Sequence, residues 1–353
     1  MKITLGEVGT YINGYAFKPS DWGTSGLPII RIQNLTNQNT IPNYFDGPYN
    51  SKFEVNKGDI LIAWSGSLGI HVWQKNKALL NQHIFRVEFN KCEIDKMYFY
   101  YAVKYNIHKM LHLTHGATMR HIIKSDFEKI VIPYPSLVVQ AKISKILNYL
   151  EQNIINYRTI LSKLDLLIKS RFDELFLNTH SIETMEIGEL FEVGSSKRIL
   201  QSELTTYGIP FYRVTDLINR INGRPVDIKQ YVDELKYMTL IKEKYVPQAG
   251  DFLITARGTI GKIYEVKQND KFYFQDGMIT WLKRKNNYIN NLFFMELVKT
   301  DWFRRQFYSS NNGTTISYLS ITDTRHLKVL LPALNLQLKF AQEVYQINKL
   351  KFG

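Results

Sequence analysis

The chain has 353 residues, with 45 lysine and arginine side chains against 32 carboxylates and a formal net charge of +13. Its hydrophobic fraction of 44% excludes a disordered chain, its length suits two domains, and its basic excess favours a polyanionic partner such as nucleic acid. The sequence has no apolar run of about 20 residues and no signal peptide, and its single Cys92 excludes an internal disulfide. We therefore expect a cytoplasmic protein that does not contact a membrane.

Three sequence blocks in the first half of the chain return in the same order in the second half. Gly-Leu-Pro-Ile-Ile-Arg-Ile from residue 26 returns as Gly-Ile-Pro-Phe-Tyr-Arg-Val from residue 208, an offset of 182. Gly-Asp-Ile-Leu-Ile from residue 58 returns as Gly-Asp-Phe-Leu-Ile from residue 250, an offset of 192. Gly-Ala-Thr from residue 116 returns as Gly-Thr-Thr from residue 313, an offset of 197. Offsets that grow through small insertions indicate the duplication of a whole domain, here residues 1–136 and 181–333.

Each copy is predicted to be rich in short strands. Residues 59–64 and 251–255 are apolar runs between glycine, asparagine and proline, which is typical of strands, and residues 97–111 and 292–307 are predicted helices. Paired glycines after the strands, at 66 and 69 and at 258 and 261, predict tight turns that need positive φ. The copies also have similar charge, with 15 basic and 10 acidic side chains in the first and 21 and 17 in the second.

The segment between the copies, residues 137–180, is predicted to be one long helix with an apolar seam. The seam residues follow heptad spacing and are Ile143, Leu147, Leu150, Ile154, Tyr157, Leu161, Leu164 and Ile168. The expected partner is the C-terminal helix, residues 334–353, whose apolar positions are Leu336, Phe340, Val344 and Ile347. Packing of the long helix onto its own domain is the alternative.

These elements together predict an α/β (α+β) fold. Two strand-rich domains in tandem are separated by helices that form an antiparallel coiled coil with pseudo-twofold symmetry. About 40 residues of helix make a rod of about 60 Å.

This layout resembles the specificity subunit of type I restriction–modification systems, over essentially the whole chain. The motifs that carry the resemblance are Gly-Ala-Thr-Met-Arg from residue 116, Asp126-Phe127, Ile-Val-Ile-Pro from residue 130 and Gln-Ala-Lys-Ile from residue 140. Their second occurrences begin at residues 313, 330 and 337. The C-terminal helix is short for the family, with only 21 residues after Pro332, so the docking of a second methyltransferase stays open.

The resemblance implies a protein that is not itself catalytic. Each repeated domain would be a target-recognition domain that reads one half of a split sequence in double-stranded DNA. The helices would set the spacer and dock DNA methyltransferase subunits, which bring S-adenosylmethionine. A separate ATP-dependent restriction and translocase subunit would join for cleavage, so Mg²⁺ and ATP would also belong to partners.

Motifs for chemistry within the chain itself are scarce. The sequence has no phosphate-binding Gly-x-x-x-x-Gly-Lys-[Ser/Thr] loop and no Asn/Asp-Pro-Pro-Phe/Tyr site for adenine methylation. Asp251 with Glu265 and Lys267 imitates a Mg²⁺-dependent nuclease, the sharpest enzymatic alternative. The first copy, however, has Trp73 and Lys75 where the second has Glu265 and Lys267. A metal ligand replaced by tryptophan argues against that site.

Zinc binding is the other metal hypothesis. The histidines with suitable spacing are His108, His112, His115 and His121. In the second copy the equivalents of His112 and His115 are Ser309 and Asn312, which are not equivalent ligands. We therefore predict no metal site and no catalytic residue.

Candidate DNA contacts are donors and acceptors in the loops that the repeat marks out. In the first copy they are Arg31, Gln33, Asn34, Trp64, Ser65, Ser67, His71, Asn81, Gln82, His115, Thr118 and Arg120. In the second copy they are Arg213, Thr215, Asp216, Arg257, Thr259, Lys262, Gln275, Asp276, Asn311, Asn312 and Thr314.

Each candidate also has a structural interpretation. Asn34 or Asp216 can cap a turn, and Asp59 and Asp251 are expected to fix the entry of a strand. About half of the set is expected to touch DNA. A stand-alone DNA-binding or scaffold protein is the alternative to a restriction–modification subunit, and the absence of a methyltransferase from the complex in the host would favour it.

Overall fold

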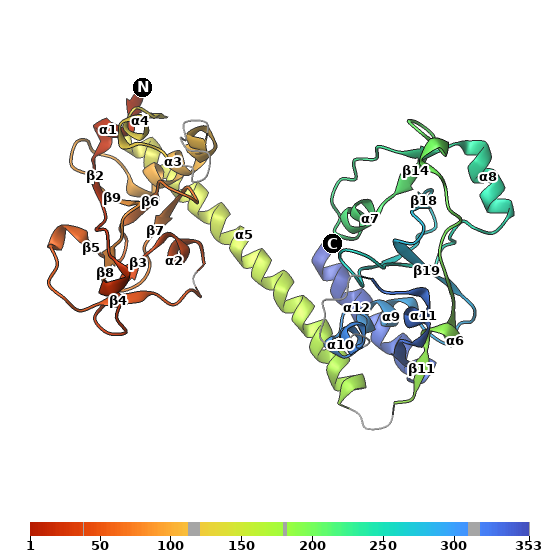
Figure 1. The fold of residues 1–353 in the computed structure, drawn as a ribbon. Coiled ribbons are helices and arrows are strands. Elements are labelled where there is room, and N and C mark those ends of the chain that lie inside the picture. The colour runs from red at the N-terminus through yellow and green to blue at the C-terminus, as the bar shows by residue number, and fades with distance from the viewer. Residues whose placement is uncertain (38, 112–120, 179–181, 310–317, 353) are drawn as a thin grey trace. The chain divides into compact units, whose positions relative to one another are not determined.

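The computed structural model describes residues 1–352 apart from 38, 112–120, 179–181 and 310–317 (Figure 1). The chain divides into two compact units, residues 1–157 and 158–353, and the boundary falls inside the long helix α5 (Leu137–Phe172). Among the described residues, no helix combines the length and the apolar character that crossing a membrane requires.

The elements of the first unit follow one another in the chain as β1 (Lys2–Thr4), α1 (Leu5–Val8), β2 (Thr10–Asn13), β3 (Leu27–Ile30), α2 (Ile32–Thr36), β4 (Asn43–Phe45), β5 (Glu54–Val55), β6 (Ile60–Ala63), β7 (Gly69–Val72), β8 (Ala78–Leu80), β9 (Ile84–Glu88), α3 (Lys96–Leu111), α4 (Lys124–Glu128), β10 (Val131–Pro133) and the start of α5.

The elements of the second unit, after the end of α5, are β11 (Thr184–Glu186), α6 (Ile187–Leu190), β12 (Phe191–Gly194), β13 (Leu204–Thr205), β14 (Ile209–Tyr212), α7 (Val214–Ile221), β15 (Tyr231–Val232), α8 (Glu234–Lys242), β16 (Phe252–Thr255), β17 (Ile263–Glu265), β18 (Tyr273–Phe274), β19 (Ile279–Arg284), α9 (Asn291–Leu297), α10 (Asp301–Ser309), α11 (Ile321–His326), β20 (Lys328–Leu330) and α12 (Leu334–Phe352).

The sheets confirm the duplication that the sequence predicts. The central sheet has the order β2-β9-β6-β7 in the first unit and β12-β19-β16-β17 in the second. A second sheet pairs β3 with β8 in parallel, as β14 pairs with β18. The first and last strands of each copy form a two-stranded sheet, β1 with β10 and β11 with β20.

The central strands β6 and β16 are buried on both faces, which explains their continuous apolar sequences. Because side chains alternate along a strand, Ile60 and Ile62 enter one hydrophobic cluster while Leu61 enters another. In β16, Phe252 and Ile254 are likewise separated from Leu253. Each unit therefore has a core on both faces of its central sheet.

A buried glutamine joins each core to the helix that follows it. Gln140 is fully buried, accepts a hydrogen bond from the Asp95 backbone N–H at 3.0 Å and donates to the Pro135 carbonyl at 2.8 Å. Its equivalent Gln337 accepts from the Asn290 backbone N–H and donates to the Pro332 carbonyl, both at 2.8 Å. The repeat thus extends to the junction between strand and helix.

The predicted helix over 292–307 is wrong in one respect, because the structure has two helices there, α9 and α10. Thr300 lies between them, donates its hydroxyl to the Leu297 carbonyl at 2.6 Å and accepts from the Phe303 backbone N–H at 3.2 Å. This side chain ends one helix and caps the next. The equivalent region of the first unit is the single helix α3, as predicted.

The predicted antiparallel helix pair forms within the second unit. Arg171 Nε of α5 lies 2.9 Å from Glu343 Oε2 of α12, and Asp165 lies 2.5 Å from Lys351. The ring of Phe340 packs edge-on against Phe172, with centroids 5.4 Å apart. Residue numbers that rise along α5 therefore meet falling numbers along α12, which defines an antiparallel pair.

The seam predicted along the whole of α5 is fully buried only at its C-terminal end. Ile168 is buried, and Ile143, Leu147 and Leu164 are half-buried. The seam residues between them are 38% to 68% exposed; these are Leu150, Ile154, Tyr157 and Leu161. The physical reason is length, because α12 has 19 residues and α5 has 36. On α12 Phe340 and Val344 are fully buried, and Leu336 and Ile347 pack around them. The pseudo-twofold relation stays a prediction.

Candidate nucleic-acid interface

Many of the candidate residues gather at one end of the central sheet in each unit. Because its strands are antiparallel, the end of β6 lies beside the starts of β7 and β9, with Ala63 paired to Gly69 and Ile84. In the second unit Thr255, at the end of β16, is paired to Ile279 at the start of β19. We call this region the loop end of each sheet.

Three of the four glycines in the predicted turns have the expected positive φ, and the prediction is wrong for Gly69, which begins strand β7. Gly66, Gly258 and Gly261 have φ of +67°, +71° and +76°, a region that side chains disfavour. Thr255 fixes the second turn, since its hydroxyl donates to the Thr259 carbonyl at 2.5 Å and accepts from the Lys262 N–H at 3.0 Å. Ser67 and Thr259 are exposed in these turns, while Lys262 is half-buried.

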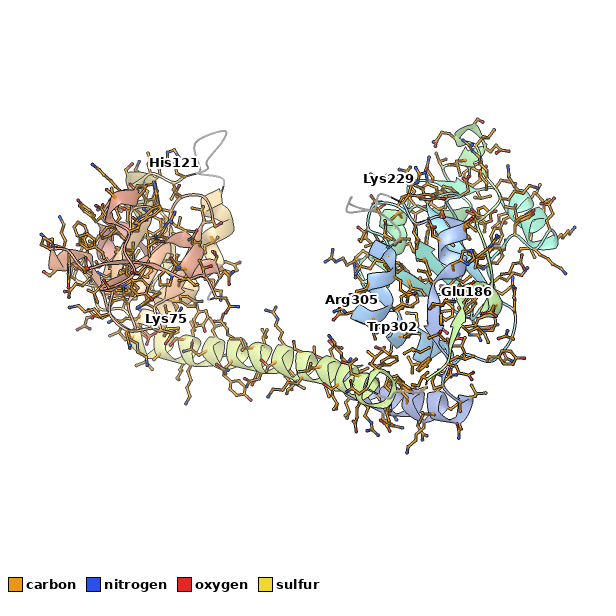
Figure 2. All side chains as sticks on the ribbon, turned by 60° about the horizontal axis from the view of Figure 1, so that its bottom comes forward. Lys75, His121, Glu186, Lys229, Trp302 and Arg305 are labelled. Carbon is orange, nitrogen blue, oxygen red and sulfur yellow. The ribbon has the colours of Figure 1, made fainter. Side chains whose placement is uncertain are left out.

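A backbone bridge ties each loop end to a distant part of its own unit. Ser65 is bridged to His121, and Arg257 is bridged to Tyr318. A neighbouring hydrogen bond repeats as well. The Ile122 N–H donates to the Trp64 carbonyl at 3.0 Å, and the Leu319 N–H donates to the Ala256 carbonyl at 2.9 Å. His121, labelled in Figure 2, therefore takes part in the first loop end by its backbone.

Trp64 joins the loop end of the first unit to its core. Its indole N–H donates to Asn13 Oδ1 at 3.2 Å, and the ring stacks on Phe85 with centroids 5.6 Å apart. The second unit has Ala256 at the equivalent position, so the two loop ends differ in bulk as well as in charge.

Two candidates act as helix caps. Asn34 accepts a hydrogen bond from the Arg31 backbone N–H at 3.0 Å, and Asp216 accepts one from the Arg213 N–H at 2.9 Å. Asn34 is only 7% exposed and also donates to the Thr40 carbonyl. The capping interpretation is confirmed for both residues.

In the second unit the parallel strands β14 and β18 bring polar side chains to one pocket. Gln275 donates its backbone N–H to the Tyr212 carbonyl at 3.0 Å, which places it beside Arg213. A pocket of about 350 Å³ is lined by Arg213, Gln275 and Asp276. A neighbouring pocket of about 190 Å³ includes Thr215 and Asp216.

Sequence reasoning missed several polar residues of these two pockets, namely Arg198, Gln201, Lys229 and Gln230. Arg213 Nε donates to Gln230 Oε1 at 3.0 Å, so the two side chains hold one another across the pocket. All four residues fall outside the repeated blocks in the sequence, and the fold around β14 brings them to the same pockets. The basic pair Lys197-Arg198 was the one available signal.

The equivalent region of the first unit holds Arg31, Asn81 and Gln82. Arg31 lies over the Trp22 ring at 4.8 Å, and the Asn81 N–H donates to the Ile30 carbonyl at 3.3 Å. The Asn81 side-chain oxygen is buried and has no hydrogen-bond partner among the described residues. Gln33 is exposed on α2.

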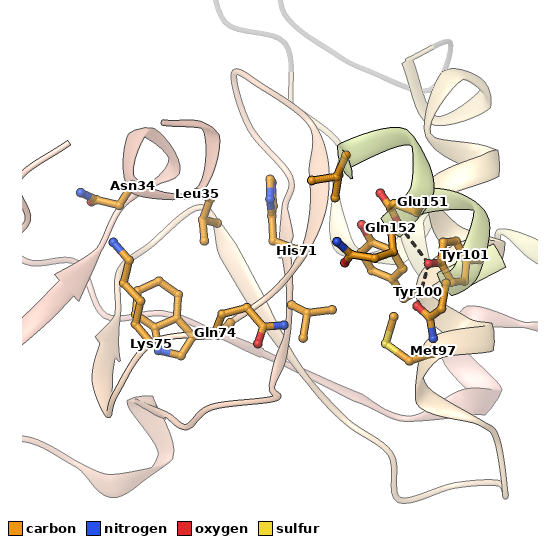
Figure 3. Close-up of a pocket in the computed structure, with 14 residues that line it drawn as sticks. Asn34, Leu35, His71, Gln74, Lys75, Met97, Tyr100, Tyr101, Glu151 and Gln152 are labelled. Carbon is orange, nitrogen blue, oxygen red and sulfur yellow. Dashed lines mark hydrogen bonds between the residues drawn. The ribbon is translucent and has the colours of Figure 1, made fainter. Parts of the chain in front are cut away.

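His71 lies apart from the other candidates. It lines a pocket of about 550 Å³ beside α3 and the start of α5, together with Asn34, Lys75 and Glu151 (Figure 3). Burial and then the charge of Lys104 lower the pKa of His71 below its usual value. Its Nε2 atom is buried and lacks a hydrogen-bond partner among the described residues. This side chain faces helices and not the loop end.

A polar network closes one side of this pocket. Tyr101 donates to Glu151 at 2.9 Å, and Lys104 forms an ion pair with the same carboxylate. Burial would raise the pKa of Glu151, but the hydrogen bonds from Lys104 and Tyr101 outweigh it and hold the pKa below its usual value. The network ties α3 to α5.

The carboxylates of the nuclease hypothesis have structural roles. Asp251 is buried, accepts from the Trp281 indole N–H at 3.0 Å and accepts from the Arg284 backbone N–H at 3.1 Å. It also accepts from the Gln248 N–H at 2.8 Å, so it fixes the entry of β16 as predicted. Asp59 does the same for β6 by accepting from the Asn56 N–H at 2.8 Å. Glu265 accepts from Asn291 at 2.6 Å.

The described part of the chain contains no group of three histidine, cysteine or carboxylate side chains that could hold a metal ion. His112 and His115 lie outside the described residues, and the His108 side chain is not described either. Cys92 is a free, half-buried thiol. Of the candidate DNA contacts, those outside the described residues are His115, Thr118, Arg120, Asn311, Asn312 and Thr314.

Comparisons with known proteins agree with this geometry. The family model of the type I restriction modification DNA specificity domain matches residues 1–166 and again residues 180–349. The chain is 24% identical over 302 residues to the EcoBI type I restriction enzyme specificity subunit of Escherichia coli, covering 76% of this chain and 62% of that protein. The chain thus spans less than two thirds of that relative's length.

An archaeal relative and a solved structure are also similar. The chain is 24% identical over 323 residues to the MjaVIII type I restriction enzyme specificity subunit of Methanocaldococcus jannaschii, covering 85% of this chain and 75% of that protein. The crystal structure of a type I restriction-modification S subunit from M. genitalium superposes with a TM-score of 0.63 at 18% identity, covering 99% of this chain and 90% of that one. This likeness shows a shared fold.

Proposed function

Because this chain belongs to the type I restriction modification DNA specificity family, we propose that it is a sequence-specific DNA-recognition subunit without catalytic activity of its own. Each unit reads one half of a split target in double-stranded DNA. The observation that carries the proposal is the double occurrence of one scaffold, with the same strand order in the central sheet and different polar side chains at its loop ends. Two copies that kept their backbone and exchanged their loop chemistry suit the reading of two different sequences.

Electrostatics supports DNA as the ligand. The net charge is +13, and basic residues stand at the loop ends and in the pockets of the second unit, including Arg198, Arg213, Arg257 and Lys229. A surface of this kind attracts the phosphate backbone regardless of sequence, while the amides and guanidinium groups beside it can contact base edges.

Partner subunits supply the chemistry in this proposal. A DNA methyltransferase subunit docks on the exposed part of α5, whose apolar side chains between residues 150 and 161 suit a protein contact. It brings S-adenosylmethionine, and an ATP-dependent restriction subunit brings ATP and Mg²⁺. The complex works in the cytoplasm. A protein that acts without a methyltransferase is the competing reading, and purification of the complex from the host separates the two.

The decisive experiment is single-molecule sequencing of host DNA for methylated adenine. We expect an asymmetric motif of two parts with an unread spacer, which disappears when the gene for this chain is deleted. A motif that persists after deletion, or a continuous motif, contradicts the proposal.

A seven-residue deletion tests the role of α5 as a spacer. Removal of residues 150–156 takes out about two helical turns and shortens the helix by about 10 Å, or about three base pairs. We expect the same two half-sites with a shorter spacer. An unchanged spacer in an active complex excludes the ruler function.

A further inference from the structure

The loop ends of the two units share one backbone position at which the side chains have been exchanged. Ser65 in the first unit and Arg257 in the second occupy the same bridge, opposite His121 and Tyr318. One backbone hydrogen bond beside this bridge is of the same type in both units, from the Ile122 N–H to the Trp64 carbonyl at 3.0 Å and from the Leu319 N–H to the Ala256 carbonyl at 2.9 Å. Because the backbone pairing repeats at this position, the two units present different side chains from an equivalent backbone site.

The exchange changes what each unit presents to solvent. Ser65 is 3% exposed, whereas Arg257 is exposed at the equivalent position. The Arg257 guanidinium lies 4.4 Å from the centroid of the Tyr318 ring, and Tyr318 is 37% exposed. Within the part of the chain that the structure describes, Arg257 forms no ion pair with a carboxylate.

A guanidinium that stacks by its face keeps the N–H donors at its edge available. Two of these donors match the O6 and N7 acceptors of guanine in the major groove, the commonest specific contact between a protein and a base. Stacking also orders the long side chain before binding, which reduces the entropy lost when the contact forms. The buried hydroxyl of Ser65 cannot make such a contact with two parallel N–H donors.

We propose that Arg257 reads a guanine in the half-site of the second unit and that Tyr318 is the positioning residue that orients its guanidinium. The first unit, with Ser65 and His121 at this position, reads its half-site without an arginine fork there. This inference rests on the proposed DNA-recognition function and names one specificity-determining residue within it.

The test selects DNA ligands from a pool of random-sequence duplexes with the full-length chain in the complex it forms in its host. The wild-type complex is expected to enrich a two-part motif. Arg257→Ala should lose the preference for guanine at one position of one half-site by about 5-fold to 150-fold and leave the other half-site unchanged. Arg257→Lys should lose most of the same preference, because lysine keeps the charge and lacks the fork.

Tyr318 provides an independent variant. Tyr318→Phe keeps the ring and should keep the motif, whereas Tyr318→Ala should weaken the preference at the same position as Arg257→Ala. The matched control is Lys328→Ala, which removes one positive charge from β20 of the same unit and should leave both half-sites unchanged. Circular dichroism checks that each variant is folded.

The outcomes separate the two proposals. If the wild-type complex enriches no motif, the DNA-recognition function itself fails. If it enriches a motif that Arg257→Ala leaves unchanged, the assignment of Arg257 fails while the function stands. A uniform loss of affinity for all sequences that Arg257→Lys restores shows a phosphate contact, and this also overturns the assignment.

Discussion

In the second unit the apolar seam of α12 is covered by the end of α5, and in the first unit the equivalent seam of α5 is largely uncovered. Phe340 and Val344 are fully buried, while their equivalents Ile143 and Leu147 are half-buried, and Leu150 is 50% exposed. The central sheets below these helices have the same strand order in both units, whereas in the second sheets β5 pairs with β8 in the first unit and β13 pairs with β15 in the second. Duplication therefore preserved the central sheet, and the packing of the helix that follows each copy is one place where the two copies have come to differ.

The largest expected effect tests this difference directly. Phe340→Ala removes a fully buried ring that contacts Phe172 and Phe176, and it should lower the free energy of unfolding of the second unit by about 3–5 kcal/mol. The equivalent change Ile143→Ala should cost the first unit only about 1 kcal/mol, because its side chain already meets solvent. Hydrogen exchange measured peptide by peptide reports each unit separately. Equal losses in both units are incompatible with the asymmetry.

The buried glutamines test where the copies remain alike. Gln337→Ala leaves one N–H and two carbonyls without a partner and should cost about 2–4 kcal/mol. Gln140→Ala should cost about 2 kcal/mol, because Gln140 makes one hydrogen bond fewer. Urea unfolding measures both. Gln342→Ala, at an exposed position of α12, is the control and should stay within about 0.5 kcal/mol of wild type.

The two caps are expected to be equivalent. Asn34→Ala and Asp216→Ala should each cost about 0.5–2 kcal/mol, because each leaves the backbone N–H of the N-cap residue, Arg31 or Arg213, without its acceptor. Thermal unfolding of the full chain measures the loss. If either variant also changes the bases selected from a duplex pool, that residue contacts DNA in addition to capping its helix.

The smallest effect concerns pH. Since burial lowers the pKa of His71 in the folded protein, the unfolded chain binds the proton more readily, and the first unit should lose stability as the pH falls through about 6.5. The second unit has Ile263 at the equivalent position and should show no such loss from this site. His71→Ile should remove the difference, and hydrogen exchange at pH 7.5 and pH 5.5 measures it. If the first unit of the His71→Ile variant loses as much stability at low pH as the wild type, other groups cause the loss.

The internal repeat of the sequence made much of this fold predictable. Two occurrences of each block identified the duplicated domain, the strands β6 and β16 and the glycine turns, because these features depend on local sequence. The roles of Asp59, Asp251 and Asn34 followed from short-range capping rules for the same reason.

Features that depend on distant pairing were not accessible in this way. The antiparallel pairing of β14 with β15 brings Gln230 to Arg213, and Arg198 lines the same pocket although it precedes β14 by more than ten residues. His71 looked like a loop residue because it follows a glycine turn, yet β7 begins at Gly69 and carries it beneath α3. The break between α9 and α10 depends on the hydroxyl of Thr300, which caps α10 by accepting from the Phe303 N–H.

The pairing of the first strand of each copy with its last has a consequence for how this chain arose. Lys2 lies opposite Pro133, and Thr184 lies opposite Leu330, so the two ends of each domain lie side by side. A domain with adjacent ends can be inserted beside a helix or removed from it with little disturbance to its core. Gene duplication and fusion therefore join two complete domains in one step, and each keeps an intact core.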